Sequence, residues 1–232
     1  MRLLLCSDFS AVGYKWLNRF FDEFDGLNCL FVGYAQEDEF PLESSAAQVF
    51  LGLKIKVINL DKGYDFKDKI DMIFVRGGNT TRLIHYLKKY GQYEKIKELA
   101  ESGVLYIGNS AGSVLAGNDT EWTLEAEPYE PDLKTLFGKD ALKGFGWINK
   151  MVFVHCTRYR MSGFDEQESP DAVFRTLDTW CYPAYLKDCR KYKKEEYMRI
   201  GNNQAYYENG DNKKILTFNW RNIPFKKIEY DV

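Results

Sequence analysis

The chain has 232 residues, 45% of them hydrophobic, and a net charge of -2 from 32 basic and 34 acidic side chains. This length fits one sizeable core, so we expect a single α/β domain over residues 1–232. The balanced charge gives no general attraction to nucleic acid or to an anionic membrane, and neither is expected as a partner.

The five cysteines are odd in number and include no CxxC pair. This pattern argues for a reducing compartment and against a disulfide framework or a zinc site. The N-terminal apolar run is too short for a signal peptide, and no run approaches the roughly 18 residues of a membrane span. We therefore expect a cytoplasmic monomer or homodimer that needs no metal and no cofactor.

The first half of the chain alternates apolar runs with amphipathic runs. Strands are predicted over 2–7, 28–35, 54–60, 70–78 and 104–109. Helices are predicted over 11–24, 42–53, 80–103 (two helices broken near Gly91) and from 111 onward. Strands separated by helices predict a doubly wound, mainly parallel sheet with helices on both faces.

The second half is predicted to add antiparallel structure. The run over 120–128 alternates like a strand with one solvated face, and a strand followed by a loop is predicted over 151–159. Residues 209–214 lie between two strand-like runs and have the composition of a hairpin turn.

The stretch "YIGNSAGSVLAG" (106–117) places Ser110 between two glycines, after a predicted strand and before a predicted helix. This is the pattern of a nucleophile elbow, in which glycines permit the sharp turn that exposes the serine hydroxyl. The amide of Ala111 can then donate to a developing oxyanion. A second donor is predicted from Gly77 or Gly78, in the loop after the strand over 70–78. Alternatively, that loop is a tight turn in which Asn79 or Thr80 caps a helix.

A serine nucleophile needs a base, and the chain contains only two histidines. His85 lies in the middle of a predicted helix and is expected to be an ordinary helix-face residue. His155 ends a predicted strand, and its pairing with Ser110 makes it the predicted base. The acid that orients the base is left open among the acidic residues between them: Asp119, Glu121, Glu125, Glu127, Glu130, Asp132 and Asp140. Glu121, Glu125 and Glu127 share one face of the predicted strand.

Three segments resemble the dipeptidase E family of serine peptidases, peptidase family S51, to which cyanophycinases are related. "FVRGGNTTRLIHYL" is similar to the family's "GGGNTFxLL", "GVLYIGNSAGSVLA" to "GxxYxGxSAGAxLA", and "VFVHCT" to "INPHFT". The resemblance implies a class I glutamine-amidotransferase-like (flavodoxin-like) fold, with Ser110 as nucleophile and His155 as base. The family's acid position, an aspartate in dipeptidase E, falls on Glu125.

The chain departs from dipeptidase E in two motif positions. Arg76 replaces the first glycine of "GGGNT", and Asn109 replaces the large aromatic residue before the nucleophile. Dipeptidase E cleaves dipeptides with an N-terminal aspartate, and its residues for that side chain have no clear match here. The candidate substrate-binding residues are Arg76, Asn79, Arg158, Arg160 and Asn202. An arginine can bind a carboxylate in a forked pair, although each arginine also fits a solvated loop.

These observations predict a serine peptidase that hydrolyses small peptides through an acyl-enzyme. One alternative is another amide hydrolase on the same scaffold, such as an acylase or a cyanophycinase-like enzyme. The other is a non-catalytic protein that holds a small anion at the two helix starts. A covalent serine-directed probe distinguishes catalysis from simple binding.

Overall fold

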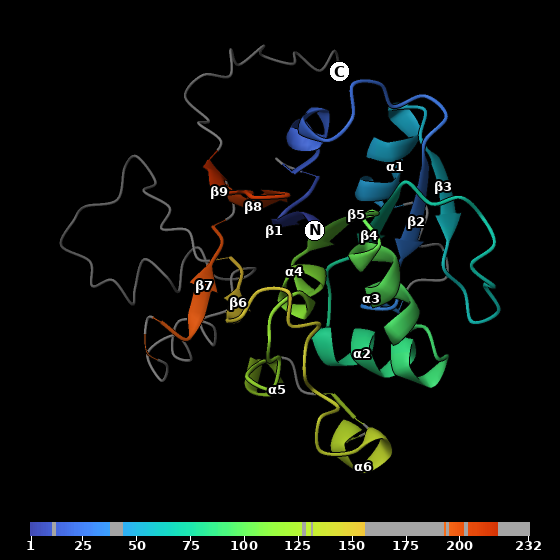
Figure 1. Ribbon diagram of the computed structural model, residues 1–232. Helices are drawn as coiled ribbons and strands as arrows, with labels where there is room; N and C mark the ends of the chain where they lie inside the picture. Colours follow the sequence, from blue (N-terminus) through green and yellow to red (C-terminus); the bar gives the residue numbers. More distant parts are fainter. Residues whose placement is uncertain are drawn as a thin grey trace, which may run out of the picture.

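The computed structural model describes residues 1–10, 13–37, 44–126, 129–130, 132–155, 193, 195–201 and 204–217, except for the side chains of residues 125 and 126. Its largest element is a seven-stranded sheet of order β3-β2-β4-β5-β1-β8-β9 (Figure 1). The strands are β1 (Arg2–Cys6), β2 (Asn28–Val32), β3 (Lys56–Asn59), β4 (Met72–Val75), β5 (Leu105–Asn109), β8 (Gln204–Asn209) and β9 (Asn212–Thr217).

The first five strands of this sheet are parallel, whereas β8 pairs antiparallel with both β1 and β9. Gly210, with φ +59°, lies in the turn between β8 and β9, as the hairpin prediction requires. The prediction of a mainly parallel sheet with antiparallel additions in the C-terminal half is confirmed.

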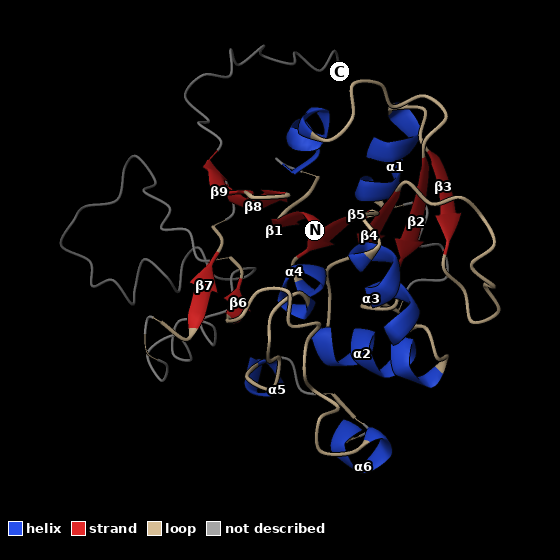
Figure 2. Ribbon diagram, viewed as in Figure 1, coloured by secondary structure: helices blue, strands red, loops and turns tan. Residues whose placement is uncertain are grey.

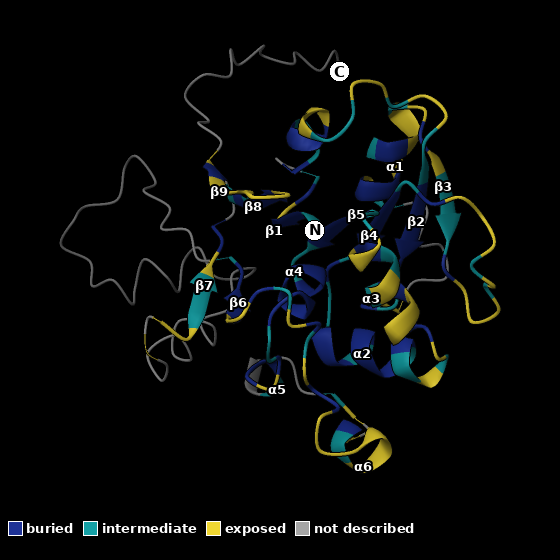
Figure 3. Cartoon of the chain, viewed as in Figure 1, coloured by how far each residue is buried: buried dark blue, intermediate teal, exposed yellow. Residues whose placement is uncertain are grey.

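Helices cover both faces of the sheet (Figure 2). One face packs on the short helix η1 (Gly13–Arg19) and on α1 (Ser45–Gly52), and the other on α2 (Thr80–Lys89), α3 (Tyr93–Glu101) and α4 (Ala111–Leu115). The strands β1, β2, β4 and β5 between these layers are almost wholly buried (Figure 3). Burial on both faces explains why these strands read as continuous apolar runs in the sequence.

The predicted break near Gly91 separates α2 from α3, and Gly91 has φ +66°. The helix predicted over 11–24 is instead a 3₁₀ helix over Gly13–Arg19, with residues 11–12 outside the described part of the chain. Gly13 lies directly on Phe9, where a Cβ atom would come within 2.8 Å of the ring. This short 3₁₀ helix already buries Trp16 and Leu17, and it ends at Arg19.

The strand predicted over 120–128 is wrong: the chain forms the short helix α5 (Thr123–Ala126) there. The amide of Glu121 donates to Asp119 Oδ1 (2.8 Å), and both the amide and the hydroxyl of Thr123 donate to the carbonyl of Thr120 (3.0 and 2.8 Å). These local hydrogen bonds replace those of a strand ladder. Glu121 and Glu125 therefore do not lie on one face of a strand, and Glu127 lies outside the described part of the chain.

A second, two-stranded parallel sheet pairs β6 (Met151–Phe153) with β7 (Tyr197–Arg199). The strand predicted at the start of 151–159 is β6, which ends at Phe153, and residues 156–159 lie outside the described part of the chain. Between α5 and β6 the chain also forms α6 (Leu133–Phe137), which has no counterpart in the sequence prediction. Within the described residues, no helix has the length and apolar character to span a membrane.

Cys6 and Cys29 are free and buried, as predicted for small hydrophobic residues, and burial raises the pKa of both thiols. Cys156, Cys181 and Cys189 lie outside the described part of the chain.

His85 is the helix-face residue that the sequence predicts. It is buried on α2, its Nδ1 lies 2.8 Å from the Tyr129 hydroxyl, and its ring stacks on Tyr86. Burial lowers the pKa of the imidazole below its ordinary 6.5, and the nearby cations Lys89 and Arg82 lower it further.

This lowered pKa predicts a pH-dependent stability. Below pH 6.5 the unfolded chain protonates His85 while the folded protein still holds it neutral. The stabilisation is therefore complete above pH 6.5 and is lost as the pH falls toward the folded-state pKa. In urea unfolding at about pH 7.5 and about pH 5.5, the His85→Gln variant should lose less unfolding free energy than the wild type. Equal losses in the two proteins would contradict this role.

Candidate active site

Ser110 occupies a strained turn between β5 and α4, with φ +50° and ψ −107°. Its amide donates to the carbonyl of Cys6 on β1 (2.8 Å). Gly112 abuts the next strand, because a Cβ atom there would lie 2.3 Å from the carbonyl oxygen of Val75. A Cβ atom on Gly108 would lie 2.7 Å from the backbone of Gly112. Only glycine fits at both positions, as the nucleophile-elbow pattern requires.

The Gly77-Gly78 loop lies beside the elbow, and its two glycines face different neighbours. A Cβ atom on Gly77 would lie 2.9 Å from the Cβ of Ser110, whereas one on Gly78, which has φ +139°, would lie 2.4 Å from the carbonyl oxygen of Ala35. Asn79 is the N-cap of α2, and its side chain accepts the amide of Arg82 (2.8 Å). The loop therefore caps a helix and contacts the serine at the same time.

His155 reaches Ser110 from the smaller sheet, two residues after the end of β6. Its Nε2 lies 2.9 Å from the Ser110 Oγ, and both residues are half-buried. His155 also has a left-handed backbone, with φ +57°. A hydroxyl within hydrogen-bond distance of an imidazole nitrogen is the geometry that activates a serine nucleophile. The structure therefore brings together the serine and the histidine that the sequence paired.

Ser7 holds the backbone of His155 in place, and the sequence interpretation missed it. Its buried hydroxyl accepts the amide of His155 (2.9 Å) and donates to the carbonyl of Ile200 (2.9 Å). Ser7 directly follows β1, so this single hydroxyl joins the main sheet to the chain after β6 and after β7. The only sequence signal was a small polar residue at the carboxyl end of a parallel strand, where site residues gather.

Asn109, which departs from the family pattern, also has a clear structural role. Its side-chain oxygen accepts the amide of Phe9 (2.9 Å), which ties the loop after β1 to the residue before the nucleophile. The hydroxyl of Ser113 adds a second tie, donating to the carbonyls of Cys6 (2.8 Å) and Gly108 (2.7 Å).

The backbone of the predicted acid, Glu125, lies in α5. Its side chain is not among those that the structure describes. Trp122, just before α5, stacks on Phe153 of β6 with ring centroids 4.2 Å apart. The start of α5 thus packs on the strand that leads to His155. Glu121 is exposed and forms an ion pair with Lys134, and Glu127 lies outside the described residues.

The predicted substrate-binding residues are only partly visible. Arg76 is half-buried in the loop before Gly77, and its amide donates to the carbonyl of Val32 (3.0 Å). Arg158, Arg160 and Asn202 lie outside the described part of the chain. Across the described residues, no group of three or more His, Cys, Asp or Glu side chains is placed to hold a metal ion.

Substituting Ser7→Ala should weaken both stability and the reactivity of Ser110. The change leaves the amide of His155 and the carbonyl of Ile200 without their buried partner, which should lower the unfolding free energy by about 1–3 kcal/mol. We expect labelling of Ser110 by a fluorophosphonate probe to slow roughly tenfold, because the imidazole loses its positioning. Ser10→Ala is the control, since its hydroxyl makes one exposed hydrogen bond to Ser45. Equal labelling rates in the two variants would show that Ser7 does not position His155.

The chain is similar to proteins of one peptidase family. The model of peptidase family S51 matches residues 3–179. Peptidase E of Haemophilus influenzae is 30% identical over 147 residues, covering 59% of this chain and 67% of that protein. Peptidase E of Actinobacillus pleuropneumoniae serotype 5b is 28% identical over 129 residues, and the match spans about half of its length (54%).

Among solved structures, a putative peptidase E protein from Listeria monocytogenes superposes with a TM-score of 0.69 at 22% sequence identity. The superposition covers 94% of this chain and 98% of that one. This likeness agrees with the amidotransferase-like α/β fold that the resemblance implied. Since the family model spans most of the chain and ends beyond both Ser110 and His155, the chain belongs to peptidase family S51.

Proposed function

We propose that this peptidase cleaves small peptides through an acyl-enzyme formed on Ser110. The observation that carries the proposal is the 2.9 Å separation of Ser110 Oγ and His155 Nε2 at a strained strand-to-helix turn. A strained backbone at such a turn is typical of a nucleophile that must project from its sheet.

In the first step, the Ser110 Oγ attacks the scissile carbonyl carbon while His155 Nε2 accepts the hydroxyl proton. The oxyanion accepts hydrogen bonds from the amides of Ala111 and Gly77. Ala111 is the first residue of α4, and the first amides of an α-helix have no intrahelical acceptor. Gly77 is the glycine that contacts Ser110, so it is a better second donor than Gly78, which faces Ala35.

The acyl-enzyme forms when the C–N bond breaks and the imidazolium returns its proton to the leaving amine. Water then attacks the ester carbonyl and gives a proton to His155. Breakage of the ester bond releases the acid, and the proton returns to the Ser110 oxygen. Each half-reaction begins and ends with neutral His155, so no other reactant is required.

Glu125 is the proposed acid that orients His155 through its other ring nitrogen. Two observations support it: the alignment with the family's acid position, and the packing of Trp122 on Phe153, which brings α5 to the strand before His155. The alternative Glu121 is engaged by Lys134.

The substrates proposed are short peptides, dipeptides among them, because the segments around Ser110 and His155 resemble dipeptidase E and the relatives carry the name Peptidase E. The residues of dipeptidase E that bind an N-terminal aspartate have no clear match in this chain. The N-terminal residue that the substrate must carry is therefore to be determined by experiment.

Replacing Ser110→Ala should abolish hydrolysis. Incubating a mixed short-peptide library with each protein, followed by mass spectrometry, should show peptides that vanish only with the wild type, at a rate at least about a thousandfold higher. A fluorophosphonate probe should label Ser110 in the wild type and should label the His155→Ala variant far more slowly. Cleavage that persists in the Ser110→Ala variant would refute the serine mechanism. An absence of both labelling and cleavage would favour a small-anion-binding protein.

Replacing Glu125→Gln should lower the turnover number about a hundredfold or more, because the amide holds the imidazole less firmly in its productive tautomer. Glu121→Gln is the matched control and should retain nearly full activity, losing only an exposed ion pair. Turnover numbers on one substrate from the library decide the point. Full activity of the Glu125 variant would remove that residue from the triad.

A further inference from the structure

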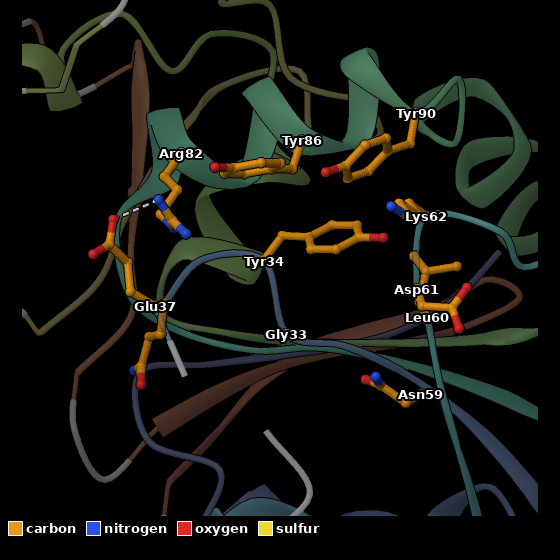
Figure 4. A pocket seen from close by; sticks show the side chains of 11 residues that line it. Gly33, Tyr34, Glu37, Asn59, Leu60, Asp61, Lys62, Arg82, Tyr86 and Tyr90 are labelled. Carbon is orange, nitrogen blue, oxygen red and sulfur yellow. Dashed lines mark hydrogen bonds and ion pairs between the residues drawn. The ribbon is translucent and has the colours of Figure 1, made fainter. Parts of the chain in front are cut away.

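A pocket of about 620 Å³ lies at the carboxyl ends of β2 and β3, beneath α2 (Figure 4). Its lining includes Tyr34 after β2, Leu60 and Asp61 after β3, Arg82 and Tyr86 on α2, and Tyr90 at the C-cap of α2. The chain runs outward from β2 to β3 and then returns to β4 on the other side of β2. Ligands of open parallel sheets bind where the strand order reverses in this way, and the volume is typical of a small-molecule site.

One wall of the pocket is aromatic. Tyr86 and Tyr90 lie one helical turn apart, and their ring centroids are 5.8 Å apart. The centroid of Tyr34 lies 5.8 Å from that of Tyr86 and 5.7 Å from that of Tyr90. Figure 4 shows the Tyr34 ring facing the two helix tyrosines. Ring faces held in this way suit the packing of another planar or bulky apolar group.

The end of the pocket nearest the start of α2 is polar and carries a cation. The Arg82 guanidinium lies 4.7 Å from the Tyr86 ring centroid, and its Nη1 pairs with Glu37 Oε1 at 2.6 Å. The Arg82 side chain is only 17% exposed, whereas that of Glu37 is 79% exposed. Among the described residues, the buried Nε of Arg82 has no hydrogen-bond partner. Because Arg82 lines the pocket and its ion-pair partner Glu37 is largely exposed, the guanidinium can donate to a peptide carbonyl or carboxylate next to the group on the tyrosines.

The pocket is connected to the nucleophile through two hydrogen-bonded loops. Gln36, which lines the pocket, donates from Nε2 to the carbonyl of Gly77 (3.0 Å). The amide of Asn79 donates to the carbonyl of Ala35 (2.8 Å). Gly77 in turn packs against Ser110. One wall of the pocket is thus bonded directly to the loop that touches the proposed nucleophile.

We infer that this pocket is a specificity pocket for the peptide substrate, and that it takes a bulky aromatic side chain close to the scissile bond. The inference rests on the proposed function. The tyrosine wall holds the aromatic ring, and the Arg82 end holds a polar group of the peptide backbone.

The test compares peptide pairs that differ only by Phe or Ala, placed in turn on each side of the scissile bond. For one of these positions, the wild type should favour Phe in kcat/KM by about tenfold or more, as expected for burying a ring. Tyr86→Ala should bring this Phe-to-Ala ratio of kcat/KM close to one. Tyr90→Ala should do the same, and it replaces Tyr86→Ala in the test if that variant does not fold. Tyr206→Ala is the matched control, because Tyr206 lies on β8, across β1 from the pocket, and it should keep the wild-type ratio.

Two results separate failure of this inference from failure of the proposed function. If the wild type cleaves the peptides through Ser110 but prefers Phe at neither position, or keeps its preference in both pocket variants, the pocket does not select the substrate. If no peptide is cleaved, binding of the same pairs to the Ser110→Ala protein is measured by calorimetry. Tighter binding of the Phe peptide that is lost with Tyr86→Ala then supports the pocket, and equal binding of the two peptides overturns it.

Discussion

The close contact of α4 with the ends of β4 and β5 is the constraint on which the site depends. Gly112 lies against the carbonyl of Val75 and Gly108 against Gly112, with no room for a side chain at either position. The turn between them must therefore pass through the left-handed conformation of Ser110, at a cost of about 1–3 kcal/mol that the surrounding packing offsets. The serine amide is held by Cys6 on β1, so three adjacent parallel strands together determine where the hydroxyl lies.

The position of the histidine depends on a second sheet. His155 belongs to the chain that leaves the two-stranded sheet, and a hydroxyl from the main sheet holds its amide through Ser7. Because the same hydroxyl donates to the carbonyl of Ile200 after β7, one buried polar group ties the chain after β6 and the chain after β7 to the end of β1. The 2.9 Å approach of imidazole to serine therefore depends on the docking of two separate sheets.

Local patterns predicted the parts of the fold that depend on local physics. The apolar strands, the break at Gly91, the hairpin turn and the elbow glycines each follow from side-chain size or backbone freedom within a few residues. The alternation over 120–128 does not produce a strand because local hydrogen bonds form a helical turn: the Asp119 carboxylate accepts the amide of Glu121, and the Thr120 carbonyl accepts the hydroxyl of Thr123. Burial of Trp122 against Phe153 satisfies the apolar pattern equally well. Ser7 and the tyrosine pocket could not be predicted, because their partners are brought together only by the order of the strands.

That strand order also couples recognition to chemistry. Asn79 caps α2 and, through its amide, holds the loop after β2, so the helix that carries Tyr86 and Tyr90 begins at the loop that contacts Ser110. A side chain packed on these tyrosines would contact the helix whose N-cap, Asn79, lies two residues after Gly77. A substrate that fills the pocket would therefore stabilise the arrangement of the amides proposed to donate to the oxyanion, and binding energy gained away from the scissile bond would support the transition state there.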